Sequence, residues 1–258
     1  NSPDTLKNLI FRLYQNIYKA GAVRNIAIKP EELTDGLIVD SVSIGSVKLD
    51  LANERVAAVN GTNLNLRLPA GSHIPPAAQG NISIYWHLTI PQAATIRFGK
   101  ISPEAYFVAL WYPQIAVYDD IDGWDRLSYN GEQEFYNNHN DFKVSITVPS
   151  NAGVWATGDL LNPADVFQKK YLDRYNTALK SYDKTVIISK EEIKQGGIYK
   201  NTSQTNTWKF SASSIPDFAF GTGPIFRWEA GLAKQPDNKP VFVNAVYREE
   251  SDDYEPVW

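Results

Sequence analysis

Hydrophobic and polar residues alternate along several short stretches of the chain. The clearest is 82–90, where every second residue is apolar: Ile82, Ile84, Trp86, Leu88 and Ile90. Successive side chains of a β-strand point to opposite faces, so this period of two predicts a strand with one buried face. The same alternation predicts strands at 62–69 and 142–149, and each ends at a proline, which cannot donate a ladder hydrogen bond.

Seven further stretches have the β-branched and aromatic residues typical of strands. They are 9–14, 36–45, 94–100, 106–112, 184–190, 207–213 and 240–247. Many short strands with little helix between them favour antiparallel sheets over an alternating α/β fold. We therefore predict an all-β fold, a large antiparallel domain of the sandwich type.

One stretch, residues 162–182, follows a helical period instead. Asn162 is a candidate N-cap, and Pro163 stands at the first helical position, where its fixed φ is favourable. The helix predicted here has an apolar stripe: Phe167, Tyr171, Tyr175, Ala178 or Leu179, and Tyr182. Such a stripe predicts an amphipathic helix inserted among the strands and packed on a sheet; a tyrosine-rich ligand site is the alternative.

Composition and charge exclude several classes of protein and of site. The chain has 258 residues, 43% of them hydrophobic, and a net charge of −4, which favours one large folded domain and gives no basic surface for nucleic acid. No run of 18 apolar residues predicts a membrane span. Cysteine and methionine are both absent; the first excludes disulfides and thiolate sites, and the second suggests a fragment of a longer protein.

Candidate chemical groups are few. The histidines, His73, His87 and His139, lack the spacing of a zinc-binding helix, so each is interpreted as structural. Residues 231–240, rich in Gly, Pro, Asn and Lys, predict either a domain boundary or a long hairpin.

The densest group of carboxylates lies in the stretch AVYDDIDGWDR, residues 116–126: Asp119, Asp120, Asp122 and Asp125. An EF-hand loop with Gly123 at its sixth position would need oxygen ligands where Tyr118 and Tyr129 stand, so that motif fails. A tight turn explains the cluster better, because Asp bonds its own backbone and Gly adopts positive φ. A calcium loop of another type stays open as the alternative.

Several motifs follow one another in a specific order. They are WYPQIAVYDDIDGW (111–124), EFY (134–136), DFKVSITVP (141–149), VWATGDL (154–160) and WKFSASSIPDFAF (208–220). This series resembles the N-terminal β domain of the M1-family zinc aminopeptidases, particularly bacterial M1-like members. The opening NSPDTLKNLIFRLYQN also resembles a hairpin that leads into the second long strand of that domain.

The resemblance implies a saddle-shaped antiparallel domain over residues 1–250 without its first strands, with 251–258 beginning the connection to a catalytic domain. Zinc would belong to that catalytic domain, whose H-E-x-x-H and G-x-M-E-N motifs do not occur here. The chain is thus expected to be a non-catalytic part of a periplasmic or secreted peptidase, with no catalytic residue, metal ligand or cofactor of its own. Its implied partners are its own catalytic domain and the N-terminus of a peptide substrate.

In typical family members a Gln and a Glu on one strand of this domain hold the substrate α-amine. The corresponding stretch here reads ALWYP, with Leu110 and Tyr112 at those two places. A tyrosine offers a hydroxyl or an aromatic face to an amine. We therefore expect Trp111 and Tyr112 to be the substrate-binding candidates, against the alternative that both side chains only pack in the sheet.

Two other classes of function compete with this one. A secreted carbohydrate-binding or adhesion module would expose a coplanar row of aromatic residues, for which Trp124, Trp155 and Trp208 are candidates. An Asp/Glu glycosidase would place two carboxylates about 5 to 10 Å apart across a cleft.

Overall fold

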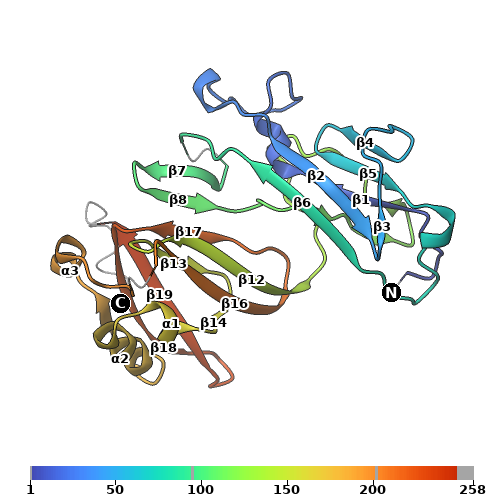
Figure 1. Ribbon diagram of the computed structural model, residues 1–258. Helices are drawn as coiled ribbons and strands as arrows, with labels where there is room; N and C mark the ends of the chain where they lie inside the picture. Colours follow the sequence, from blue (N-terminus) through green and yellow to red (C-terminus); the bar gives the residue numbers. More distant parts are fainter. Residues whose placement is uncertain (1, 94–95, 201–202, 249–258) are drawn as a thin grey trace. The chain divides into compact units, whose positions relative to one another are not determined.

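A computed structural model describes residues 2–93, 96–200 and 203–248 of the protein (Figure 1). The predicted all-β fold is confirmed, since antiparallel strands dominate and the described helices are short. The chain divides into two compact units. The first combines residues 1–100, 108–140 and 215–219, and the second combines residues 101–107, 141–214 and those from 220 onward.

The first unit is a sandwich of two antiparallel sheets, because strands from both sheets bury one face in a common core. One sheet has the order β4 (Ala57–Asn60), β5 (Asn63–Arg67), β1 (Asn8–Arg12), β9 (Gln114–Ile115). The other has the order β3 (Val47–Lys48), β2 (Leu37–Ile44), β6 (Ile82–Leu88). Leu9, Leu66 and Val42 are fully buried in that core, and Ile84 and Trp86 of β6 pack against it.

The strand predicted at 82–90 is β6, and its side chains alternate between half-buried and exposed as the sequence pattern requires. A hairpin of β10 (Tyr118–Asp119) and β11 (Gly123–Trp124) follows β9. Short 3-10 helices complete the unit: η1 (Tyr14–Tyr18), η2 (Pro30–Glu32) and η3 (Ala70–Ser72).

The second unit has three antiparallel sheets. The first has the order β12 (Asn140–Pro149), β16 (Thr205–Ile215), β14 (Asp159–Leu160). The second has the order β13 (Gly153–Ala156), β17 (Phe220–Gly223), β8 (Ala105–Val108), β7 (Phe98–Ser102). The third has the order β15 (Thr185–Ile188), β18 (Phe226–Lys234), β19 (Pro240–Arg248). The chain passes between the units within β7 and again within β8. Residues 231–240, predicted as a boundary or a hairpin, form the hairpin that joins β18 to β19.

The single helix predicted at 162–182 is two helices, α1 (Pro163–Val166) and α2 (Lys169–Ala178). Phe167 separates them in an extended conformation, with φ −90° and ψ 144°, and its ring packs on Trp208 with 5.1 Å between the ring centroids. Burial of this ring outweighs continuation of the helix. Asn162 makes no cap hydrogen bond but accepts one from the Lys209 N–H at 2.8 Å.

The stripe of α2 packs on β15 and β18, as predicted, because Tyr171, Tyr175 and Ala178 are buried. Leu179 and Tyr182 lie beyond the helix and are exposed, at 37% and 54%, so the prediction that Tyr182 belongs to the stripe is wrong and the stripe ends at Ala178. A third helix, α3 (Lys190–Gln195), begins with a capping box between Ser189 and Glu192. No helix in the described ranges is long and apolar enough to cross a membrane.

Candidate functional site

The stretch that holds Trp111 and Tyr112 is a loop, and the strand predicted at 106–112 ends early. β8 stops at Val108, and Leu110 has a φ of +56°, which a leucine adopts only when its surroundings hold it there. The buried Gln15 does so, since its Nε2 donates to the carbonyls of Ala109 at 3.1 Å and Leu110 at 3.0 Å. The end of the predicted strand is therefore a turn at Leu110, held by the hydrogen bonds from Gln15.

A second segment, far away in the sequence, fixes the two candidate side chains. The Tyr112 hydroxyl donates to Asp217 Oδ1 at 3.0 Å, and the Trp111 indole N–H donates to the Phe218 carbonyl at 3.1 Å. Gln114 Nε2 adds a hydrogen bond to the Pro216 carbonyl at 2.8 Å. The WYPQ and PDF sequences therefore form one site, which we call the Tyr112–Asp217 junction.

Three aromatic rings contact one another at this junction: Trp86 packs on Trp111, and Trp111 packs edge-on against Tyr112. The Trp86 indole N–H, on β6, donates to the Trp111 carbonyl at 3.0 Å. Ring centroids lie 6.0 Å apart between Trp86 and Trp111, and 5.3 Å apart between Trp111 and Tyr112. All three side chains are half-buried, so the rings are positioned by packing and still expose part of their surface.

The electrostatics of the junction follow from burial. Burial raises the pKa of Asp217, although hydrogen bonds from the Phe218 N–H and the Tyr112 hydroxyl act in the opposite direction. Burial, followed by the charge of Asp217, also raises the pKa of Tyr112, so its hydroxyl stays a donor at neutral pH. In the described part of the chain no ion pair joins a cation to Asp217, and a cationic donor such as an amine would complement this carboxylate.

Asp217 was not singled out by sequence reasoning. It stands within the WKFSASSIPDFAF motif, whose order after WYPQ was noted, but its pairing with Tyr112 depends on contacts 105 residues apart along the chain. The order of motifs was the only available signal.

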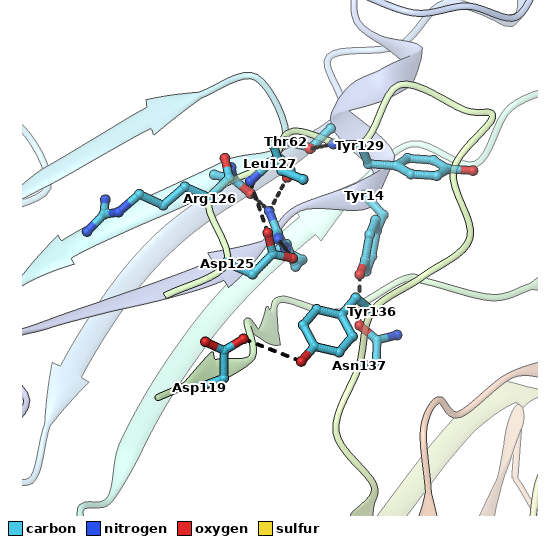
Figure 2. Close-up of polar contacts among 11 residues, drawn as sticks. Tyr14, Thr62, Asp119, Asp125, Arg126, Leu127, Tyr129, Tyr136 and Asn137 are labelled. Carbon is cyan, nitrogen blue, oxygen red and sulfur yellow. Dashed lines mark hydrogen bonds and ion pairs between the residues drawn. The ribbon is translucent and has the colours of Figure 1, made fainter. Parts of the chain in front are cut away.

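The Asp-rich stretch is a turn, as preferred from the sequence (Figure 2). Asp119 Oδ1 accepts hydrogen bonds from the N–H groups of Ile121 at 3.0 Å and Asp122 at 2.8 Å, and these bonds lower the pKa of Asp119. Gly123 takes a φ of +70°. These local bonds explain the residue types without a ligand.

Asp125 has a different task, because it pairs with a buried cation. Arg12 on β1 is 3% exposed and donates to Asp125, to Asn63 and to the Leu127 carbonyl. Figure 2 shows Asp125 and Leu127 near Tyr14, whose hydroxyl donates to Asn137 at 2.8 Å. We call this set the Arg12–Asp125 cluster; the sequence did not indicate Arg12 as the partner.

No group of three His, Cys, Asp or Glu side chains that could hold a metal occurs in the described ranges. His87 contacts Asp40 at 2.9 Å, with both side chains largely exposed, and a surface pair of this kind contributes little.

The tryptophans named for a sugar-binding surface do not form an exposed row. Trp124 and Trp208 are buried, at 8% and 1% exposure, and the half-buried Trp155 packs edge-on against Phe226 with 5.3 Å between ring centroids. Packing accounts for these three residues.

No protein-family model and no curated protein matches the chain. Two solved structures are similar to it: a mutant of a two-domain M1 zinc metallopeptidase bound to L-tryptophan, with 10% identity and a TM-score of 0.46, and a mutant M1 zinc metallopeptidase from Deinococcus radiodurans, with 12% identity and a TM-score of 0.45. Each match covers 96% of this chain and 41% of the other chain. This chain therefore spans less than half the length of either of these structures.

Proposed function

We propose that this chain is the non-catalytic N-terminal β domain of an M1-like zinc aminopeptidase, and that its Tyr112–Asp217 junction forms part of the wall of the peptide-binding cleft. One observation carries the proposal. Two motifs that the family resemblance selects, WYPQ and PDF, are distant in sequence and are joined by three hydrogen bonds. A contact between these particular residues is what a functional unit shared by both motifs would require.

The role proposed for the junction is to hold the free α-amine of a peptide substrate. Asp217 accepts hydrogen bonds from the Tyr112 hydroxyl and from the N–H groups of Phe218 and Leu110, and a carboxylate offers about four acceptor sites. An ammonium group would bind to the acceptor site that is left and to the tyrosine oxygen or ring. The raised pKa of Asp217 falls when a cation binds, since opposite charge favours the ionised form. This pair would take the place of the Gln and Glu that Leu110 and Tyr112 replace.

Zinc is proposed for a catalytic domain outside this chain, where it would supply an activated water for attack on the peptide carbonyl. This chain would exclude water from the cleft and orient the substrate. A periplasmic or secreted location is part of the same proposal, and it rests on the family resemblance alone.

The proposal is tested first on the reading frame that contains this chain. We expect an H-E-x-x-H motif with a distal Glu after residue 258, and zinc-dependent release of amino acids from aminoacyl 4-nitroanilides by the full-length product. A frame that encodes an unrelated domain, or a zinc-loaded product without this activity, would overturn it.

The role of the junction is tested by Tyr112→Phe and Asp217→Asn in that full-length enzyme. We expect KM to rise about tenfold or more for each, since a charge-assisted hydrogen bond contributes about 1.5–3 kcal/mol. Tyr136→Phe is the matched control, because Tyr136 also donates to an aspartate, Asp119, at 3.4 Å. Equal KM values in all three variants and the parent would remove the junction from substrate binding while leaving the family assignment intact.

A further inference from the structure

Gln15 is a buried amide side chain next to the Tyr112–Asp217 junction. It lies in η1, which follows β1, and is 3% exposed. Its Nε2 donates to the carbonyls of Ala109 at 3.1 Å and Leu110 at 3.0 Å, whereas its Oε1 is buried without a hydrogen-bond partner among the described residues. An unpaired buried acceptor is unfavourable, so the two donor contacts are what explains a glutamine at this position.

One of these contacts is made to a peptide group that also contacts Asp217. The carbonyl of Ala109 and the N–H of Leu110 belong to the same planar peptide group, and in its trans form the C=O and the N–H point in opposite directions. The C=O accepts the hydrogen bond from Gln15, and the N–H donates to Asp217. Fixing the oxygen therefore fixes the direction of the N–H, and polarisation of the C=O makes that N–H a stronger donor.

The second contact holds the peptide group on the other side of Leu110. This residue has a φ of +56°, a conformation that L-residues with a side chain rarely adopt. Because Gln15 also donates to the Leu110 carbonyl, the same amide holds the peptide groups before and after the strained residue. Without these contacts the loop would relax and turn the Leu110 N–H away from Asp217.

We propose that Gln15 is a positioning residue for the junction, and that it acts through the Ala109–Leu110 peptide group to hold Asp217 in place for a substrate amine. The proposal rests on the amine-binding role proposed for the junction. Gln15 is buried and does not touch the amine; it determines where the Asp217 carboxylate presents its remaining acceptor site. It therefore affects the binding of substrate and not the cleavage of the peptide bond.

The neighbouring Asn16 shows how an amide with a structural role is bonded in the same helix. Its Nδ2 donates to the Gly61 carbonyl at 3.1 Å, and its Oδ1 accepts from the Leu37 N–H at 3.0 Å. Gly61 lies between β4 and β5, and Leu37 begins β2 of the other sheet, so Asn16 connects the two sheets through both ends of its amide. Gln15 uses its donor end alone, and both contacts go to the loop that carries the junction.

The role is tested on the 258-residue chain by following the amide signals of Leu110 and Phe218 by NMR while the pH is varied. Both N–H groups donate to Asp217, so both signals should report its titration in the parent. Gln15→Met keeps a side chain of similar length and removes the donors. We expect the Phe218 signal still to follow the titration in this variant and the Leu110 signal to lose its response. The pKa of Asp217 should also be higher, since one hydrogen bond to its ionised form is lost.

Gln114→Met is the matched control. Gln114 also donates from Nε2 to a backbone carbonyl, that of Pro216 at 2.8 Å, and also has a buried Oε1 without a partner among the described residues. Its contact is to the other segment of the junction, so we expect the Leu110 signal to keep its response. An unchanged Leu110 response in Gln15→Met, or a loss of this response in both variants, would overturn the proposal.

If Gln15→Met does not fold, hydrogen exchange in the parent chain gives the answer. Breaking the contacts of Gln15 releases the peptide group, so the Leu110 N–H and the Gln15 Nε2 protons should be protected from exchange to a similar degree. A Leu110 amide that stays protected while the Nε2 protons exchange freely would overturn the proposal.

The link to substrate binding is tested through KM in the full-length enzyme. We expect Gln15→Met to raise KM about tenfold with little change in kcat, because a hydrogen bond to a carboxylate is lost. The double variant with Asp217→Asn should have the KM of Asp217→Asn alone, since a residue that acts through Asp217 has no effect without it. Multiplied effects in the double variant would overturn the proposal. An unchanged KM in Asp217→Asn would instead refute the amine-binding role, whereas the amide titration tests the position of Asp217 independently.

Discussion

Asp125 and Asp217 are both half-buried carboxylates in the first unit, yet their surroundings differ in one respect. Asp125 is paired with the buried Arg12, and the cluster is completed by Asn63 and backbone groups. Asp217 accepts hydrogen bonds from Tyr112 and the Phe218 N–H, and no ion pair in the described ranges involves it. The first carboxylate is neutralised by a direct ion pair, whereas the second has hydrogen bonds from neutral groups and the charge of Arg97 without an ion pair.

The presence or absence of an ion pair distinguishes a carboxylate that stabilises the fold from one whose charge is available to a ligand. A buried ion pair costs desolvation on both sides and stabilises only while both partners are present. A carboxylate held by neutral donors keeps an unbalanced negative charge, and its pKa is raised by burial. A perturbed group with a fixed position and no direct ion pair is the better candidate for function.

The largest effect is expected from Arg12→Met, which removes the cation paired with Asp125 and the donor to the Leu127 carbonyl. Removing one partner of a buried ion pair costs about 3–5 kcal/mol, measured as the free energy of unfolding in urea. Arg126→Met is the control, because Arg126 is exposed and makes one long contact of 3.3 Å to Asn65. A loss below about 1 kcal/mol in Arg12→Met would mean that the cluster does not stabilise the unit.

Next come the two aspartates themselves, each changed to asparagine. Asp125→Asn should lose about 3 kcal/mol, because a buried guanidinium is left without its counter-charge. Asp217→Asn should change stability by about 1 kcal/mol, since the amide oxygen still accepts the hydrogen bonds from Tyr112 and the Phe218 N–H, a buried negative charge is removed, and the hydrogen bond from the Leu110 N–H is lost. Equal losses would abolish the distinction between the two sites.

The pH dependence of Asp217 sharpens the comparison. Its folded-state pKa is raised above the ordinary value of 3.8, so the folded chain binds the proton more tightly than the unfolded chain. The stabilisation from this proton is complete below pH 3.8 and is lost as pH rises through the folded pKa, with a slope of at most about 1.4 kcal/mol per pH unit. Urea titrations from pH 3 to 7 should show this falling contribution in the parent and not in Asp217→Asn; parallel curves would contradict it.

The smallest effect is expected in the Asp-rich turn. Gly123→Ala should cost about 1 kcal/mol, because an alanine is strained at a φ of +70°, whereas the nearest atom, 3.7 Å from the added carbon, leaves room for it. Gly71→Ala is the control, since Gly71 has neither a positive φ nor an atom within 4 Å. Identical melting temperatures for the two variants would show that the turn geometry does not limit stability.

Patterns of neighbouring residues in the sequence predicted those elements that depend mainly on interactions between residues close together in the chain. β6 and β12 follow from the alternation of apolar and polar residues. The Asp119 turn follows from residue types that bond their own backbone. In these elements each residue's preference and the tertiary structure agree.

The failures lie where distant contacts outweigh local preference. Phe167 interrupts a helical pattern because its ring is buried against Trp208. β18 was missed since its burial does not alternate: Glu229 is buried within it and lies 3.3 Å from Lys184. The loop at Leu110 depends on hydrogen bonds from Gln15, and the pairing of Tyr112 with Asp217 is equally non-local.

The first unit includes residues 215–219, which come after most of the second unit in the sequence. During synthesis on the ribosome, Asp217 emerges 105 residues after Tyr112, a delay of roughly 5 to 20 s at about 5–20 residues per second. During that interval the sandwich lacks the hydrogen bond from Tyr112 to Asp217 that fixes the WYP loop. Its completion is therefore timed by translation of the intervening unit, which makes the Tyr112–Asp217 contact a late step in biogenesis.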